Sequence, residues 1–418
     1  MRVSLRPLLA GVLLALSACG TTPPPPAFEP PPAATGEWWP CPLTGMARRE
    51  CTRVTVPVGP PHAESISLAV TRLPARRPAR RIGALVLLPG GPGLSGLQEA
   101  LAATVEYPPA LRDRFDIVGV DMRGVGRSSP VDCGEPIGPL DGLRDAPDLS
   151  AADVDAVDAQ VRDYVEYCRI QHGELIGRLG SRVLVRDLEA VREALGEERI
   201  SLLAHSYGTL PGQLYLASHP DRVRSAVFDG VLDPARSGPA MALRTVHSRE
   251  ELDAEQVPVP QSRRIPADVR AAFRELAPGG PSLALFLGRH CADFTWPSSV
   301  GGLLRWLESR SGEPRWRLNT VARDYAACVH WPEHEPPPPG AVWPAGGGVR
   351  PLLIGSEGDI RTPLAGAERV AERFDAPLVT VGGGRHGLVG HGSACAERAA
   401  VAYLSGRSGL GAGDRVRC

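Results

Sequence analysis

The 418-residue chain contains no lysine, so all 46 of its basic residues are arginine. This absence excludes Schiff-base chemistry on a lysine, serine–lysine dyads and the phosphate-binding lysine of a P-loop. The formal net charge is only −1 and aromatic residues make up 5% of the chain. The sequence therefore offers neither the basic surface nor the stacking platforms that nucleic acid requires, and no nucleic-acid partner is expected.

The N-terminus carries the features of a targeting signal. Residues 8–16 are apolar and follow two arginines, but the run is too short to span a bilayer as a helix. Leu16-Ser17-Ala18-Cys19 then resembles a bacterial lipobox, in which the cysteine is lipidated and becomes the new N-terminus. We expect a lipoprotein signal peptide at 1–18 and a proline-rich linker at 19–37, with an ordinary signal peptide or a buried helix as the alternative. The protein would then be exported and lipid-anchored to the outer face of a bacterial membrane, or released to the cell exterior.

Export changes the expected chemistry of the cysteines, because disulfides persist in oxidising compartments. Setting Cys19 aside leaves an even number of cysteines, and none has the Cys-x-x-Cys spacing of a zinc site. His330 and His334 are separated by Pro332 and lack the glutamate of a metal motif, so no metal is expected. Many connectivities are open, but near-neighbour pairing closes short loops and is favoured: Cys41–Cys51, Cys133–Cys168, Cys291–Cys328 and Cys395–Cys418.

Short apolar segments alternate with helix-like segments along most of the chain. This alternation is typical of an α/β fold with a mostly parallel sheet, here of about eight strands. It stops after the sixth strand, and we expect a helical cap at 234–348 between two parts of the core, 38–233 and 349–418. The expected strands are 53–58, 65–72, 82–88, 115–120, 200–204, 226–231, 351–355 and 377–381, and the expected helices are 151–171, 183–195, 364–374 and one after Gly208.

Ser206 lies in a candidate nucleophile motif. Residues 200–209 would form a strand, the turn Ala204-His205-Ser206-Tyr207-Gly208 and the start of a helix. A nucleophile elbow needs this arrangement, because a sharp turn exposes the serine hydroxyl while small residues on either side let strand and helix cross closely. Ala204 stands where a glycine is usual and adds one methyl group.

An acid and a histidine follow two later strands. Asp359 comes just after the strand at 351–355, and His386 follows the strand at 377–381. The order serine, aspartate, histidine is that of α/β-hydrolases. In such a triad His386 takes the serine proton, while Asp359 orients the imidazole and stabilises its charged form. His391 is the competing histidine, but it lies further from the strand end.

The segment Gly90-Gly91-Pro92-Gly93 follows the third expected strand. Acyl transfer needs backbone N–H groups directed at the developing oxyanion, and we assign this role to Gly91 and Tyr207. The region also fits the dinucleotide fingerprint Gly-x-Gly-x-x-Gly, with Asp116 after it. A dinucleotide is unexpected outside the cytoplasm, and that interpretation leaves the triad unexplained, so no cofactor is predicted.

Together these motifs resemble the secreted tripeptidyl aminopeptidases of actinobacteria, which are α/β-hydrolases related to proline iminopeptidases. The resemblance runs from about residue 38 to residue 418, and it departs at Pro89, where iminopeptidases have histidine, and at Ala204. The C-terminal region is similar to the family's TAP-like segment. The residues that carry the resemblance are Gly90-Gly91-Pro92-Gly93, Asp121-x-Arg123-Gly124-x-Gly126-x-Ser128, the elbow, Asp229-Gly230-Val231-x-Asp233-Pro234, the Asp359 and His386 turns, Cys328-Val329-His330-Trp331-Pro332, Cys395, Tyr403 and Cys418.

The resemblance implies a cofactor-free serine exopeptidase that releases short peptides, tripeptides above all, from free N-termini. Peptides would be its substrates, and the sequence does not indicate an oligomeric state. Such an enzyme needs an anion for the substrate ammonium. An exported carboxylesterase and a non-catalytic surface-binding lipoprotein are the alternatives, because a fold does not fix a substrate. The cap supplies candidate acids for the ammonium: Glu250, Glu251, Asp293, Glu308 and Glu333.

Overall fold

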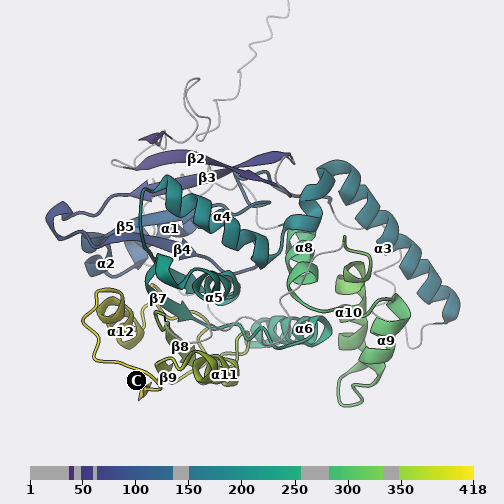
Figure 1. Ribbon diagram of the computed structural model, residues 1–418. Coiled ribbons are helices and arrows are strands. Elements are labelled where there is room, and N and C mark those ends of the chain that lie inside the picture. The colour runs from purple at the N-terminus through teal and green to yellow at the C-terminus, as the bar shows by residue number, and fades with distance from the viewer. Residues whose placement is uncertain (1–36, 42–48, 60–63, 135–149, 256–281, 333–347) are drawn as a thin grey trace, which may run out of the picture.

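The fold is built on one mixed sheet. The computed structural model describes residues 37–41, 49–59, 64–134, 150–255, 282–332 and 348–418. The strands lie in the order β1-β2-β3-β5-β4-β6-β7-β8-β9-β10 (Figure 1). The first three strands pair antiparallel with their neighbours, and the pairs from β5 to β10 are parallel. The strands are β1 (Trp39–Pro40), β2 (Glu50–Pro57), β3 (Ser65–Leu73), β4 (Gly83–Leu88), β5 (Phe115–Val120), β6 (Ile200–His205), β7 (Val223–Asp229), β8 (Leu352–Ser356), β9 (Leu378–Val381) and β10 (Arg415–Arg417).

Helices cover both faces of the sheet, because its central strands are apolar on both sides. In β4, Leu85 and Leu87 face one buried cluster, while Val86 and Leu88 face the other. The first cluster includes residues of α1 (Gly96–Glu106), α2 (Pro109–Arg114) and α12 (Ala394–Leu404). The second includes residues of α4 (Ser181–Ala194), α5 (Thr209–Ser218) and α11 (Leu364–Phe374). This three-layer arrangement confirms the α/β-hydrolase fold that the alternation and the motifs predicted.

The sheet is larger than the expected eight strands, because β1 and β10 extend its two edges. Strand β1 has only two residues, and β10 is the polar sequence Arg-Val-Arg, with all three residues exposed. Neither has the apolar run or the alternation that signals a strand. Strand β10 pairs with β9, and the disulfide between Cys395 and Cys418 joins α12 to the residue that follows β10.

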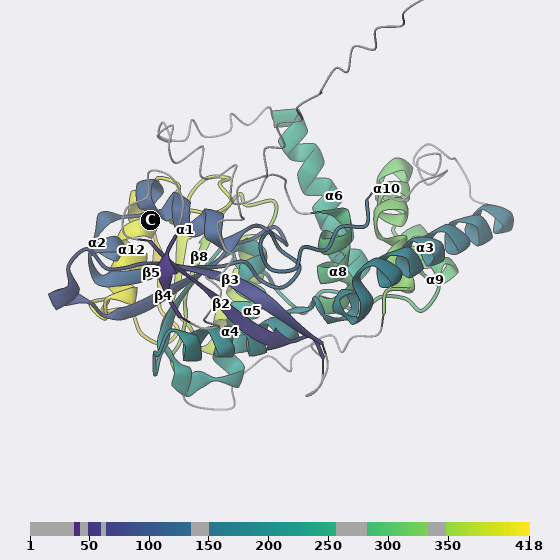
Figure 2. The same cartoon turned by 90° about the horizontal axis from the view of Figure 1, so that it is seen from above.

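The chain between β7 and β8 is helical where it is described, and it lies to one side of the sheet (Figure 2). It contains α6 (Gly238–Glu255), α8 (Leu283–Asp293), α9 (Val300–Glu308) and α10 (Arg315–Tyr325). Helix α3 (Ala151–His172) packs against α9, although it comes much earlier in the chain. His330 lies 2.7 Å from the Asp158 carboxylate of α3, through its Nε2 atom. The cap-like part of the molecule therefore includes α3 as well as the segment that follows β7.

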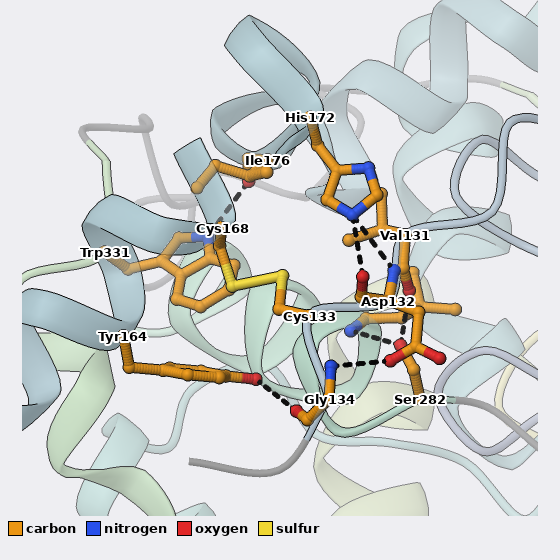
Figure 3. The surroundings of a disulfide bond; sticks show 11 residues. Val131, Asp132, Cys133, Gly134, Tyr164, Cys168, His172, Ile176, Ser282 and Trp331 are labelled. Carbon is orange, nitrogen blue, oxygen red and sulfur yellow. Dashed lines mark hydrogen bonds between the residues drawn. A yellow bond between two sulfur atoms is a disulfide. The ribbon is translucent and has the colours of Figure 1, made fainter. Parts of the chain in front are cut away.

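Four disulfides join the same neighbouring cysteines that the sequence favoured: Cys41–Cys51, Cys133–Cys168, Cys291–Cys328 and Cys395–Cys418. The Cys133–Cys168 bond fastens α3 to the chain that follows β5 (Figure 3). Beside it, the Tyr164 hydroxyl donates to the carbonyl of Gly134 at 3.2 Å, and the Trp331 indole donates to the carbonyl of Ile176 at 2.9 Å (Figure 3). The disulfide and the Tyr164 contact thus hold α3 in place, and the Trp331 contact holds the turn that follows it.

Arg123, in the turn after β5, forms a buried ion pair. Its guanidinium donates to the Asp187 carboxylate of α4 at 2.7 and 2.6 Å, and both side chains are 1% exposed. It also donates to the carbonyls of Pro57 and Val58 at 3.1 Å. Because every charge has a partner, this pair fixes the turn after β5 against α4 and the end of β2.

Candidate active site

The turn after β6 has the conformation of a nucleophile elbow. Ser206 follows the last residue of β6 with φ at +53°, in the left-handed region that side chains rarely adopt. A short 3₁₀ turn, Ser206–Gly208, then leads into α5. The Thr209 hydroxyl donates to the Ser206 carbonyl at 2.6 Å and accepts from the Leu232 N–H at 2.9 Å. The surrounding structure therefore holds the serine in a strained position, as an elbow requires.

Glycines allow the close approaches at this turn. A Cβ atom on Gly208 would lie 2.2 Å from the carbonyl oxygen of Leu88, so no side chain fits there. A Cβ atom on Gly90 would lie 2.7 Å from the Cβ of Ser206. The extra methyl of Ala204 faces Gly212 of α5, where an added Cβ would be 3.5 Å away. This is an ordinary van der Waals distance, so the methyl of Ala204 fits without a clash on this side.

The predicted acid and histidine meet beyond the ends of β8 and β9. The His386 Nδ1 atom lies 2.9 Å from Oδ2 of Asp359, which is 4% exposed. Asp359 also accepts from the backbone N–H groups of Arg361 and Thr362 at 2.9 and 3.0 Å, and from the Thr362 hydroxyl at 2.7 Å. These donors hold the carboxylate in place, and the hydrogen bond to Nδ1 leaves the other ring nitrogen free for proton transfer.

Ser206 and His386 line one cavity of about 540 Å³. Gly90, Gly91 and Tyr207 also line it; Tyr207 follows Ser206 in the chain, and Gly90 lies against the Ser206 side chain. The remaining lining comes from helices α1, α6 and α8, the loops after β4, β7, β8 and β9, and the residue before Ser206: Leu94, Glu99, His205, Leu232, Met241, Thr245, Ser248, Phe286, His290, Arg361, Thr362, Gly387 and His391. Ser206, Tyr207, Gly91 and His386, which the sequence motifs singled out, thus line this cavity, whereas most of its walls come from residues without a motif.

The competing histidine, His391, lines the same cavity but stands apart from Asp359. Its ring lies against that of His205, with centroids 6.0 Å apart. Burial, and then the charge of His205, lower the pKa of His391. Because the bond to Asp359 belongs to His386, the geometry favours His386 as the partner of Ser206.

A second polar network, which sequence reasoning missed, borders the cavity. The Tyr107 hydroxyl donates to Glu99 and lies 2.9 Å from Nε2 of His205. On the other side of that ring, Nδ1 lies 3.3 Å from Oδ2 of Asp229. Asp229 in turn accepts the N–H groups of Leu388 and Val389 at 2.6 and 2.8 Å. Asp229 thereby holds the loop that carries His386. The sequence signal for Asp229 was its place in the motif Asp229-Gly230-Val231-x-Asp233-Pro234, to which no role was assigned.

The acids proposed for substrate binding do not line this cavity where they are described. Asp293 is buried, and it accepts the Ser181 N–H and hydroxyl at 2.6 Å and the Tyr207 hydroxyl at 2.7 Å. Glu308 is exposed on α9. The side chains of Glu250 and Glu251, all of Glu333, and the predicted signal and linker with Cys19 lie outside the described residues.

Within the described part of the chain, no group of three or more histidine, cysteine, aspartate or glutamate residues could hold a metal ion. No helix in the same ranges is both long and apolar enough to cross a membrane.

Comparisons with known proteins agree with this geometry. A family model described as the alpha/beta hydrolase fold matches residues 83–276, and one described as TAP-like protein matches residues 316–409. The serine protease Hip1 of Mycobacterium tuberculosis is 26% identical over 471 aligned residues, which cover 88% of each chain. The tripeptidyl aminopeptidase of Streptomyces lividans is 27% identical over 450 aligned residues, 86% of this chain and 82% of its own. Carboxylesterase B of Mycobacterium tuberculosis is 33% identical over 194 aligned residues, 45% of this chain and 37% of its own. The chain is thus a TAP-like serine hydrolase of the α/β-hydrolase fold, which confirms the resemblance that its motifs carried.

Proposed function

We propose that this protein is an exported, lipid-anchored serine exopeptidase that releases short peptides, expected to be tripeptides, from free N-termini. The observation that carries the proposal is the hydrogen bond between His386 and Asp359 at 2.9 Å, with His386 and Ser206 lining one cavity. The relatives that align with most of the chain include one named as a tripeptidyl aminopeptidase and one named as a serine protease.

The proposed reaction begins at the scissile amide. The Ser206 Oγ atom attacks the carbonyl carbon while Nε2 of His386 takes the hydroxyl proton, and Asp359 stabilises the resulting imidazolium. The N–H groups of Gly91 and Tyr207 would stabilise the oxyanion. His386 then gives its proton to the departing amine, which leaves the N-terminal peptide as an ester on Ser206. Water, deprotonated by His386, releases that peptide and restores the serine.

The test compares a tripeptide anilide that has a free amine with its N-acetylated twin. The proposal expects cleavage of the free form and little or none of the acetylated form. Ser206→Ala should lower kcat by roughly 10⁴-fold or more, since the nucleophile of a triad cannot be replaced by its neighbours. Equal cleavage by the variant would refute the assignment of Ser206.

A carboxylesterase is the second candidate, because the named carboxylesterase shares 33% identity with 45% of this chain. The same assay separates the two functions. Turnover of simple acyl esters without cleavage of either peptide would establish the esterase.

Export and lipid anchoring are a separate part of the proposal. Four disulfides support an oxidising compartment, and the lipobox-like sequence ending at Cys19 supports the anchor. In a bacterial host, labelled fatty acid should be incorporated into the full chain and not into Cys19→Ala. Equal incorporation by both would refute the anchor.

A further inference from the structure

An enzyme that selects free N-termini must hold an ammonium group at a fixed place near its nucleophile. A cation that leaves water is costly unless an anion meets it. Among the described residues that line the cavity, Glu99 is the only carboxylate. It comes from the first turn of α1 and not from the cap, where the sequence placed the candidate acids.

Glu99 is positioned to bind a ligand and not only to complete the fold. Its side chain remains 22% exposed while it lines the cavity with Ser206 and His386. The hydroxyl of buried Tyr107 donates to one of its oxygens, which fixes the carboxylate and leaves further acceptor positions open. The N-terminal turn of a helix also favours a negative charge at this position.

The hydrogen bonds around Tyr107 show which groups carry protons. Burial, followed by the charge of Glu99 and its hydrogen bond, raises the pKa of Tyr107 well above its usual value, so the phenol stays protonated. Since its single proton goes to Glu99, its oxygen accepts from Nε2 of His205 at 2.9 Å. The other ring nitrogen of His205 faces Asp229 at 3.3 Å, so both nitrogens of His205 face acceptors. This pattern matches a protonated imidazole.

Glu99 and Asp229 share the one imidazolium of His205, whose Nε2 atom lies 4.0 Å from Oε1 of Glu99, so these three groups together keep one net negative charge. Burial opposes the charge of His205, but Asp229 and then Glu99 raise its pKa above the usual value. Asp229 has a lowered pKa and pairs with that imidazolium. His391 has a lowered pKa, and Arg361 is exposed where it lines the cavity. Glu106 is the remaining acid that interacts with Glu99, but it does not line the cavity.

We propose that Glu99 is the subsite that binds the α-ammonium group of the peptide substrate, with Tyr107 and His205 holding its carboxylate in place. This inference rests on the proposed peptidase function. It assigns the amine specificity to the core helix α1, next to the glycine-rich loop, rather than to an acid of the cap.

The test uses the full chain and compares wild type with Glu99→Gln, Glu99→Asp and Glu308→Gln. For each, kcat/KM for the free tripeptide anilide is divided by the rate of labelling of Ser206 by a fluorophosphonate, which carries no amine. We expect Glu99→Gln to lower this ratio roughly 10- to 100-fold, mainly through KM, because the ammonium loses its charge partner. Glu99→Asp should recover part of the loss, and Glu308→Gln, on an exposed face of α9, should match wild type.

The possible outcomes distinguish a failure of the Glu99 subsite from a failure of the proposed peptidase function. Suppose that wild type cleaves the free peptide and that Glu99→Gln has the same ratio of peptide cleavage to fluorophosphonate labelling as wild type. The assignment of Glu99 as the amine subsite is then wrong, while the peptidase function stands. If wild type reacts with the fluorophosphonate but cleaves no peptide, the peptidase function fails and the subsite fails with it. A fall in the labelling rate equal to the fall in peptide cleavage would show a structural role for Glu99 and also overturn the subsite.

Discussion

The hydroxyl of Tyr207 donates to the Asp293 carboxylate at 2.7 Å, so the residue after Ser206 is hydrogen-bonded to helix α8. Asp293 also accepts the Ser181 N–H and hydroxyl at the start of α4. One buried carboxylate therefore joins the elbow, the cap and the core. Asp293 was a candidate for binding substrate, and its contacts assign it instead to holding the site together.

Removal of this contact should destabilise the protein. Tyr207→Phe leaves the ring in place but takes one donor from a buried carboxylate, which should cost about 1–3 kcal/mol in the free energy of unfolding. Urea unfolding measures this change. Tyr403→Phe is the matched control, since its hydroxyl donates to the Arg350 carbonyl at an exposed site and should cost less than about 1 kcal/mol. Equal losses in the two variants would contradict the role assigned to Asp293.

The pair of His205 and Asp229 should make stability depend on pH. Asp229 and Glu99 raise the pKa of His205 against the effect of burial, so the folded protein holds this proton more tightly than the unfolded chain. The resulting stabilisation is fully present below the unfolded pKa of about 6.5 and is lost as pH rises through the higher folded pKa. We expect the stability difference between wild type and His205→Asn to shrink from pH 6 towards pH 9 in urea unfolding. A difference that grows over this range would contradict the pairing.

Gly90 should tolerate no side chain. An added Cβ would lie 2.7 Å from the Cβ of Ser206 and 3.2 Å from its Oγ, so Gly90→Ala must shift the nucleophile or the glycine-rich loop. Displacement by a fraction of an ångström should lower the fluorophosphonate labelling rate by about 10-fold or more. Gly409→Ala, where an added Cβ meets nothing within 4 Å, serves as the control. Unchanged labelling of Gly90→Ala would show that the loop does not press on Ser206.

The Cys133–Cys168 disulfide should stabilise the attachment of α3. Its cysteines are 35 residues apart, and cross-linking over such a loop is worth roughly 2–4 kcal/mol. The double variant Cys133→Ala/Cys168→Ala should lose about that free energy of unfolding in urea. A loss below about 0.5 kcal/mol would mean that the remaining contacts, such as those of Tyr164 with Gly134 and of Asp158 with His330, suffice to hold α3.

The sequence predicted the elements whose formation depends on local pattern. The mostly apolar segment of β5 and the amphipathic helix α11 were predicted with their observed boundaries. Ser206, Asp359 and His386 were predicted as the triad because each follows a strand in a turn of characteristic composition, and the structure places His386 beside Asp359 and in one cavity with Ser206. Residues that follow different strands come close together because parallel strands bring their carboxyl ends to one edge of the sheet.

What the sequence did not predict depends on contacts between distant segments. Glu99 has no motif, and its place in the cavity depends on how α1 packs against β3, β4 and β5. Helix α3 was expected as a helix, but nothing in its pattern placed it against α9. Asp293 could not be separated from surface acids, because its burial is set by Tyr207 and Ser181, which come from other elements.

The most direct test of the account is the first product released from a longer peptide. Wild-type protein is incubated with a heptapeptide that has a free N-terminus, and the products are followed over time by mass spectrometry beside Ser206→Ala. The account predicts that the N-terminal tripeptide appears first with the wild type and that no product forms with the variant. Cleavage at internal bonds, or equal product formation by Ser206→Ala, would contradict it.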